Sequence, residues 1–199
     1  MRKSIVIVSV LILVMSSLAY AGNNPAAKVA VHVRAHNAKA GCTITPAILD
    51  CTGIVTTDPG FSVDAFPVFY DLAEYKGCEY GLCWPAWTYS AAFSSCSDLV
   101  IGVVDWPGSG ASHAWTLCQA GVAVPSWVWL YADGPGLICP CPYPATGLIS
   151  VLDCAGGLDD PCGIFCAGVF GEPGDDPCEP CDPTVTEPTT WGAIKSMFE

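Results

Sequence analysis

The chain has 199 residues, of which 52% are hydrophobic and only 13% are charged, and its 19 acidic side chains outnumber seven basic ones. This balance excludes the basic surface that nucleic acids and anionic lipids require, and the apolar content excludes disorder over most of the chain. Thirteen cysteines are typical of a disulfide framework and leave an odd thiol.

Residues 1–21 have the three parts of a signal peptide. Arg2 and Lys3 precede an apolar run from Ile5 to Val14, and small residues end the segment at Ala19-Tyr20-Ala21. The pattern predicts cleavage before Gly22, and the run is shorter than the ~20 residues that cross a bilayer. We expect a secreted protein, extracellular or at the cell surface, with the periplasm as the alternative. Its mature part of 178 residues keeps five basic and 19 acidic side chains, a formal charge of −14.

Alternating hydrophobic and polar residues predict β-strands along most of the mature chain. In residues 28–36, Val29, Val31 and Val33 alternate with polar residues such as His32 and Arg34, so we expect the valines in a core and the polar side chains in solvent. The other predicted strands are Val63–Asp71, Cys78–Trp84, Leu99–Trp106, Ser112–Cys118, Val124–Ala132, Leu137–Tyr143, Leu148–Cys154 and Ile164–Phe170.

These strands, separated by Gly/Pro turns, predict an all-β fold for residues 22–182. We expect an antiparallel β-sandwich cross-linked by disulfides, because an open sheet could not cover so many apolar side chains.

The C-terminal end changes character. Residues 183–190 are rich in proline and threonine and predict an extended linker. Residues 191–199 form an amphipathic tag, in which Trp191, Ile194 and Phe198 would share one face of a helix. Such a short helix is not stable alone in water, so it should fold only against something. Sorting, anchoring and packing on the domain all remain open as its role.

Several short motifs are shared with known proteins. They are Glu79-Tyr80-Gly81-Leu82, Trp84-Pro85, Cys96-Ser97-Asp98-Leu99, Ile101-Gly102, Cys118, Gly171 to Cys178, and Trp191-Gly192-Ala193-Ile194-Lys195 after a Thr/Pro stretch. On these residues, most of the mature chain resembles a group of secreted, cysteine-rich proteins from genomes of uncultivated bacteria, a resemblance that implies no particular activity. The region from Tyr70 to Trp84 resembles cohesin-like and other immunoglobulin-like sandwiches, which implies a fold and not a function.

Hairpin geometry predicts one disulfide near the C-terminal end of the domain. If Leu137–Tyr143 and Leu148–Cys154 flank a turn, Cys139 faces Cys154 at bonding distance. Cys141 is then the candidate for the free thiol.

Two further pairings are expected upstream. A turn at residues 107–110 would bring Cys96 to Cys118 if a bulge shifts the register slightly. Cys42 and Cys51 bracket a proline-containing loop, which we expect them to close.

Several acidic, cysteine and histidine side chains are candidate metal ligands. Calcium is a candidate cofactor, because acidic pairs in glycine-rich loops supply the oxygen ligands that it prefers, although solvated turns explain them as well. The pairs are Asp159 with Asp160 and Asp175 with Asp176. A zinc site is an alternative to disulfides for Cys162, Cys166, Cys178 and Cys181. His32 and His36 would lie ~13 Å apart on a strand, too far to share an ion.

Aromatic residues and one polar cluster provide the other candidate sites. Trp84, Trp87 and Trp127 could stack on sugar rings, whereas core packing explains them equally. Asp105 with Ser112 and His113 is the one place where Asp, Ser and His gather.

These observations lead to a ranked set of functions. The first is a secreted or cell-surface structural or interaction protein without catalytic activity, which binds another protein or itself. A carbohydrate-binding module is the alternative, and a secreted hydrolase is the third candidate.

Overall fold

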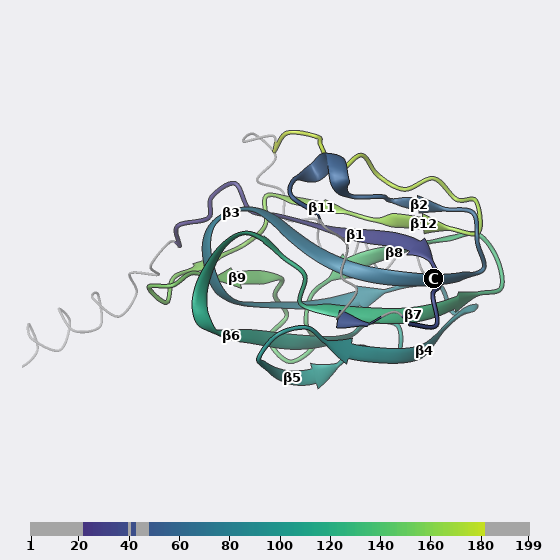
Figure 1. Ribbon diagram of the computed structural model, residues 1–199, viewed down its shortest axis with the longest axis horizontal. Coiled ribbons are helices and arrows are strands. Elements are labelled where there is room, and N and C mark those ends of the chain that lie inside the picture. Colours follow the sequence, from purple (N-terminus) through teal and green to yellow (C-terminus); the bar gives the residue numbers. More distant parts are fainter. Residues whose placement is uncertain (1–21, 40, 43–47, 182–199) are drawn as a thin grey trace, which may run out of the picture.

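A computed structural model describes residues 22–39, 41–42 and 48–181 (Figure 1). The predicted signal peptide, linker and C-terminal tag lie outside the described residues and stay predictions. The strands are β1 (Lys28–Ala35), β2 (Thr57–Asp58), β3 (Ser62–Cys83), β4 (Thr88–Ser95), β5 (Leu99–Val103), β6 (Ser109–Ala123), β7 (Ser126–Ala132), β8 (Gly136–Cys141), β9 (Ser150–Leu152), β10 (Leu158–Asp159), β11 (Gly163–Phe165) and β12 (Ala167–Val169). A 3-10 turn spans Cys51–Gly53, and no helix of the described chain has the length and apolarity needed to cross a bilayer.

The long strand β3 organises the fold. Sequence reasoning divided it into two strands, Val63–Asp71 and Cys78–Trp84, but it runs continuously for 22 residues. Register shifts against β6 fall between Phe69 and Gly77, and Asp71 has a φ of 58°. Bulges of this kind bend a strand and increase its twist without ending it. Polar residues in this region therefore mark a bend and not a loop.

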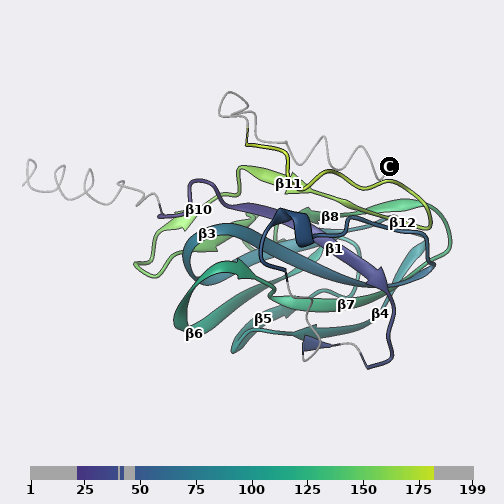
Figure 2. The same cartoon turned by 45° about the horizontal axis from the view of Figure 1, so that its top comes forward.

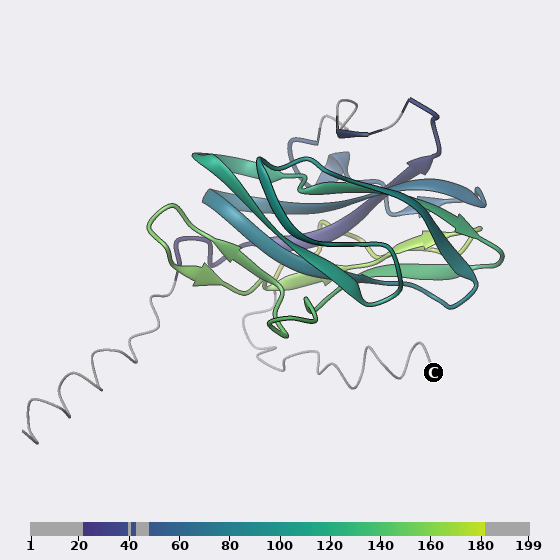
Figure 3. The same cartoon turned by 90° about the horizontal axis from the view of Figure 1, so that it is seen from below.

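The strands form an all-β sandwich around β3. On one side of β3, β7 pairs with its N-terminal part and β6 with the remainder, and β4 and β5 extend these partners outward. On the other side lie β1, β9 and β8, which lead to β11 and β12. Figures 2 and 3 show β8, β11 and β12 in one layer and β4, β5, β6 and β7 in the other.

Two groups of buried side chains hold the layers together. The main core contains alternate residues of β1 and β3, such as Val29, Val31 and Tyr80, together with Trp84. A smaller core lies on the outer face of the same strands and includes Phe66, Tyr70 and Trp127. The hydroxyl of Tyr70 donates to the Pro177 carbonyl at 2.6 Å, so the C-terminal segment of the domain covers this smaller core.

The second core corrects the prediction for β1. His32 was expected in solvent, but its side chain is buried. Its Nδ1 accepts a hydrogen bond from the Val55 N–H at 3.0 Å. Burial, followed by the charge of nearby Arg34, lowers the pKa of His32 to about 4. The alternation in sequence identified two faces of the strand correctly, but both faces are covered.

Six disulfides cross-link the described chain. They are Cys42–Cys96, Cys51–Cys178, Cys83–Cys141, Cys118–Cys154, Cys139–Cys166 and Cys162–Cys181. The predicted pairs Cys42–Cys51, Cys96–Cys118 and Cys139–Cys154 are therefore wrong as pairs, although each of these cysteines is bonded. The odd thiol is the buried Cys78 and not Cys141.

The predicted turn forms, with an antiparallel bridge between Tyr143 and Leu148, but the disulfide prediction failed because β8 and β9 do not pair with each other beyond it. Gly81 of β3 lies opposite Cys141 and Gly77 lies opposite Leu152, so β8 and β9 follow one another along the same edge of β3. The partner of β8 on its other edge is β12, with Ile138 opposite Ala167. Extending that register by one residue brings Cys139 opposite Cys166, the observed partner.

Candidate binding surface

The predicted Asp–Ser–His cluster is not assembled. Ser112 and His113 are neighbours in β6, so their side chains point to opposite faces of the sheet. His113 is buried, and its hydrogen bonds go to Ser97 at 2.9 Å and Tyr80 at 3.3 Å instead of to Asp105. The hydrolase hypothesis depended on Asp105, Ser112 and His113 lying together, and the structure does not bring them together.

His113 belongs to a buried polar network. The Tyr80 hydroxyl also contacts Ser126, and the two rings of Tyr80 and His113 stack with centroids 5.5 Å apart. Burial lowers the pKa of His113 to about 4 and raises the pKa of Tyr80 well above its usual value. Both groups are therefore neutral near pH 7, and their hydrogen bonds satisfy polar atoms within the core.

The acidic candidates for calcium act mainly as hydrogen-bond acceptors for the backbone. Asp159 accepts from the Asn24 N–H at 2.8 Å, whereas its neighbour Asp160 is exposed. Asp175 accepts from the N–H of Cys166 at 2.7 Å, and Asp176 accepts from Cys178 at 2.9 Å. Within the described chain, none of these aspartates belongs to a group of three metal-ligating side chains. Calcium binding there stays a prediction.

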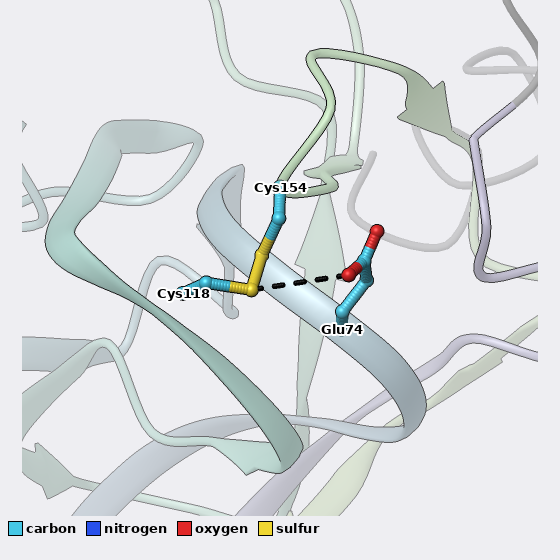
Figure 4. A group of neighbouring side chains, drawn as sticks. All are labelled: Glu74, Cys118 and Cys154. Carbon is cyan, nitrogen blue, oxygen red and sulfur yellow. Dashed lines mark hydrogen bonds between the residues drawn. A yellow bond between two sulfur atoms is a disulfide. The ribbon is translucent and has the colours of Figure 1, made fainter.

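One group of described residues does have the spacing of metal ligands: Glu74, Cys118 and Cys154 (Figure 4). Cys118 Sγ lies 3.9 Å from Glu74 Oε2, but it is bonded to Cys154. Disulfide sulfur has no thiolate charge and is a poor metal ligand. The four cysteines considered for zinc are likewise bonded, to partners that do not form one cluster.

The three tryptophans proposed for sugar stacking differ in exposure. Trp84 lies in the main core and Trp127 in the smaller core, so neither ring offers a face to a ligand. Trp87 is 49% exposed, and its Nε1 donates to the Pro135 carbonyl at 3.2 Å.

A group of rings, three of them exposed and Trp129 partly buried, lies beside Trp127 on the outer face of β4 and β7. We call Phe61, Tyr89, Trp129 and Tyr131 the aromatic row. Tyr131 lies directly opposite Tyr89, and its ring centroid is 5.1 Å from that of Trp129 and 6.3 Å from that of Phe61. The sequence placed Trp127, Trp129 and Tyr131 on one face. The sequence could not show that the solvent-exposed part of this face lies around Tyr131, because the neighbouring rings of Phe61 and Tyr89 come from other segments.

Polar contacts fix the orientation of Trp129. Its Nε1 donates to Ser62 Oγ at 3.0 Å, and the His36 ring stacks on it at 4.0 Å with an interplanar angle of 7°. His36 Nδ1 lies 2.7 Å from the buried Asp64 carboxylate, which also contacts Arg34. Trp129 is therefore held in a fixed orientation and does not have to order on binding.

A second exposed apolar surface lies at the edge of the same layer. We call Leu99, Ile101 and Val103 of β5 the edge patch. Leu99 and Ile101 are 59% and 64% exposed, and the adjacent Trp106 is also exposed. β5 pairs only with β6 among the described strands, and Tyr143 Oη is 3.5 Å from the Ile101 carbonyl oxygen. The strand thus presents both an apolar face and a largely open edge.

Comparison with known proteins gives structural similarity alone. No family model matches the chain, and no curated protein sequence matches it. Two similar solved structures are cohesin modules. One is from a family 33 glycoside hydrolase of Clostridium perfringens ATCC13124, with 12% identity, a TM-score of 0.46, and coverage of 71% of this chain and 95% of that one. The other is a type II cohesin domain from the cellulosome of Acetivibrio cellulolyticus, with 13% identity, a TM-score of 0.48, and coverage of 73% and 96%.

The resemblance to cohesin-like sandwiches and the resemblance to secreted, cysteine-rich bacterial proteins both stay predictions.

Proposed function

We propose that this protein is a secreted, non-catalytic binding module that docks a protein partner along β5. The observation that carries the proposal is the edge patch, three alternate apolar side chains on an exposed edge strand. Edge strands with open N–H and C=O groups are templates for another strand, and natural proteins usually protect them with charge, proline or a covering segment.

The edge of β5 lacks most of that protection. Its sequence, Leu-Val-Ile-Gly-Val, contains neither a charged residue nor a proline. Val100 faces the main core, so the side chains on either side of it point outward. Addition of a partner strand would combine backbone hydrogen bonds with burial of Leu99, Ile101 and Val103.

The test compares two equal changes of charge. Ile101→Asp should abolish docking, whereas Leu49→Asp, at an exposed apolar residue outside the strands, should not. A photo-crosslinking side chain at position 101 or at position 49 would be used in the exporting cell, and sedimentation velocity of the purified protein would detect pairing with a second copy. Equal cross-linking at both positions, together with unchanged sedimentation and localisation of Ile101→Asp, would exclude docking on β5.

The aromatic row supports a second candidate function, carbohydrate binding. Planar rings held open in a fixed orientation suit the apolar faces of sugar rings, and the Trp129 environment provides polar groups beside them. Isothermal titration with soluble polysaccharides tests this candidate. Tyr131→Ala should remove binding and Trp106→Ala, outside the row, should preserve it. If both variants bind as the original protein does, the row is not a sugar site.

A further inference from the structure

Two buried carboxylates lie beside the first described residue of the chain. Asp153 is 3% exposed and Asp159 is 9% exposed, and they lie on either side of the β9–β10 turn. Within the described residues, no lysine, arginine or histidine forms an ion pair with either side chain. Buried charges are normally paired, because their removal from water is costly. A positively charged group beside these two carboxylates would therefore be stabilising.

Gly22 lies against the Asp159 carboxylate and close to Gly157, and Figure 2 shows the start of the described chain beside β10. A side chain at position 22 would overlap the Asp159 carboxylate. A Cβ built on Gly157 would lie 2.8 Å from Asp153 Oδ2 and 3.2 Å from the nitrogen of Gly22, so both atoms border the same side of Gly157. Gly22 therefore lies against the Asp159 carboxylate, which occupies the space that a side chain at this position would need.

The residues that follow are anchored to the same carboxylates. The Asn23 N–H donates to Asp153 Oδ2 at 3.1 Å, and the Asn24 N–H donates to Asp159 Oδ2 at 2.8 Å. Asp153 Oδ1 accepts from Ala155 and Gly157, but no described residue donates to Asp159 Oδ1. The two carboxylates therefore hold the backbone of Asn23 and Asn24 in place.

The sequence predicts signal-peptide cleavage immediately before this glycine. We propose that the α-ammonium group of Gly22, created by that cleavage, binds between Asp153 and Asp159 and locks the mature N-terminus onto the β9–β10 hairpin.

The chemistry of the step is a peptide hydrolysis by the signal peptidase. Water adds its hydroxyl to the Ala21 carbonyl carbon, the Ala21–Gly22 bond breaks, and Ala21 leaves with the signal peptide as a carboxylate. The Gly22 nitrogen takes the proton from water and a second one from solvent, and becomes positively charged. Before cleavage, the same nitrogen is a neutral amide and leaves the two carboxylates without a cation.

The test is a thermodynamic cycle on the mature protein. One form begins at Gly22 with a free amine, and the other is acetylated there, which removes the charge. Acetylation should lower the thermal midpoint by at least about 5 °C, since removing one member of a buried ion pair is strongly destabilising. In Asp159→Asn the effect of acetylation should fall below half, and in the matched control Asp160→Asn, at the neighbouring exposed residue, it should be unchanged.

Three other results would overturn the proposal. If acetylation has the same effect in Asp159→Asn, the effect is steric and no ion pair exists. If calcium raises the midpoint of the free-amine form and chelation lowers it, while acetylation changes nothing, a metal ion is the cation. A third form of the protein begins at Ala21, so its α-ammonium group lies one residue before Gly22. It should have the midpoint of the acetylated protein, and a midpoint equal to that of the Gly22 form would also contradict the proposal.

Discussion

Acidification from pH 7 to pH 4 should destabilise the domain through two buried histidines. The pKa values of His113 and His32 are lowered to about 4, in both cases chiefly by burial. In the unfolded chain each ring takes up a proton near pH 6.5. Because the folded pKa is the lower one, the histidines contribute their full stability above pH 6.5, and this contribution is lost as the pH falls toward 4.

The magnitude follows from the difference between the two states. A pKa lowered from 6.5 to about 4 corresponds to about 3 kcal/mol for each histidine. The hydrogen bonds agree with a neutral His32, since its Nδ1 accepts the Val55 N–H and could not do so when protonated. By pH 4 the two rings together should reduce the free energy of unfolding by about 6 kcal/mol.

Urea unfolding followed by tryptophan fluorescence at pH 7.0, 5.5 and 4.0 measures this loss. His32→Gln and His113→Gln should each remove about half of the pH dependence, whatever their effect at pH 7. Asp50 and Asp98 do not interfere, because hydrogen bonds from Thr52 and Thr116 lower their pKa values and move their effect to more acidic pH. A stability that stays constant from pH 7 to pH 4.5, or an unchanged pH dependence in the double variant, would refute the reasoning.

Three further changes test the framework. Replacing both Cys51 and Cys178 by alanine should lower the free energy of unfolding in urea by about 4 kcal/mol. The other disulfides already shorten the path along the chain between these two cysteines to about 30 residues. If they were absent, the loop closed by Cys51–Cys178 would be longer and its loss would cost about 5 kcal/mol. Gly110→Ala should lower that free energy by about 1–3 kcal/mol, since a Cβ there would overlap the Tyr80 carbonyl oxygen; an unchanged value would contradict the close approach. Deletion of residues 183–199 should leave the thermal midpoint unchanged and alter the location of the protein in cell fractionation, and a large drop in midpoint would show that the tail packs on the domain.

The class of fold could be predicted from sequence because it depends on local patterns. Alternation along residues 28–36 identified the faces of β1, and the Gly/Pro turn at residues 107–110 marked the β5–β6 hairpin, in which Val103 lies opposite Gly110. The continuity of β3 could not be predicted, because a bulge and a loop use similar polar residues. The burial of His32 could not be predicted either, since the segment that covers it is remote in sequence.

The disulfides show a related limit. A hairpin rule relates cysteines in strands that pair with each other, and it failed when applied to two strands that share β3 as a partner. The same rule gives the correct answer for Cys139 and Cys166, once β8 is known to pair with β12. For the candidate surface, sequence identified the aromatic face of β7, but its exposed end depends on Phe61 and Tyr89.

The buried position of Cys78 determines how this protein can associate. An odd cysteine in a secreted chain usually raises the prospect of a disulfide between molecules. Cys78, however, lies in the middle of β3 between β6 and β9, is 4% exposed, and belongs to the main core. Burial, followed by the charge of Glu79, raises the pKa of its thiol, so little reactive thiolate forms.

The burial of Cys78 therefore argues against an intermolecular disulfide, and the edge patch and the aromatic row are our candidates for non-covalent association. We expect a thiol reagent such as Ellman's reagent to label no cysteine in the native mature protein and one cysteine after unfolding without reductant. Cys78→Ala should remove that single label and leave the sedimentation of the native protein unchanged. A disulfide-linked dimer that disappears in Cys78→Ala would show instead that the core opens far enough for this thiol to react. Association would then depend on Cys78 in β3 and not on the edge patch of β5.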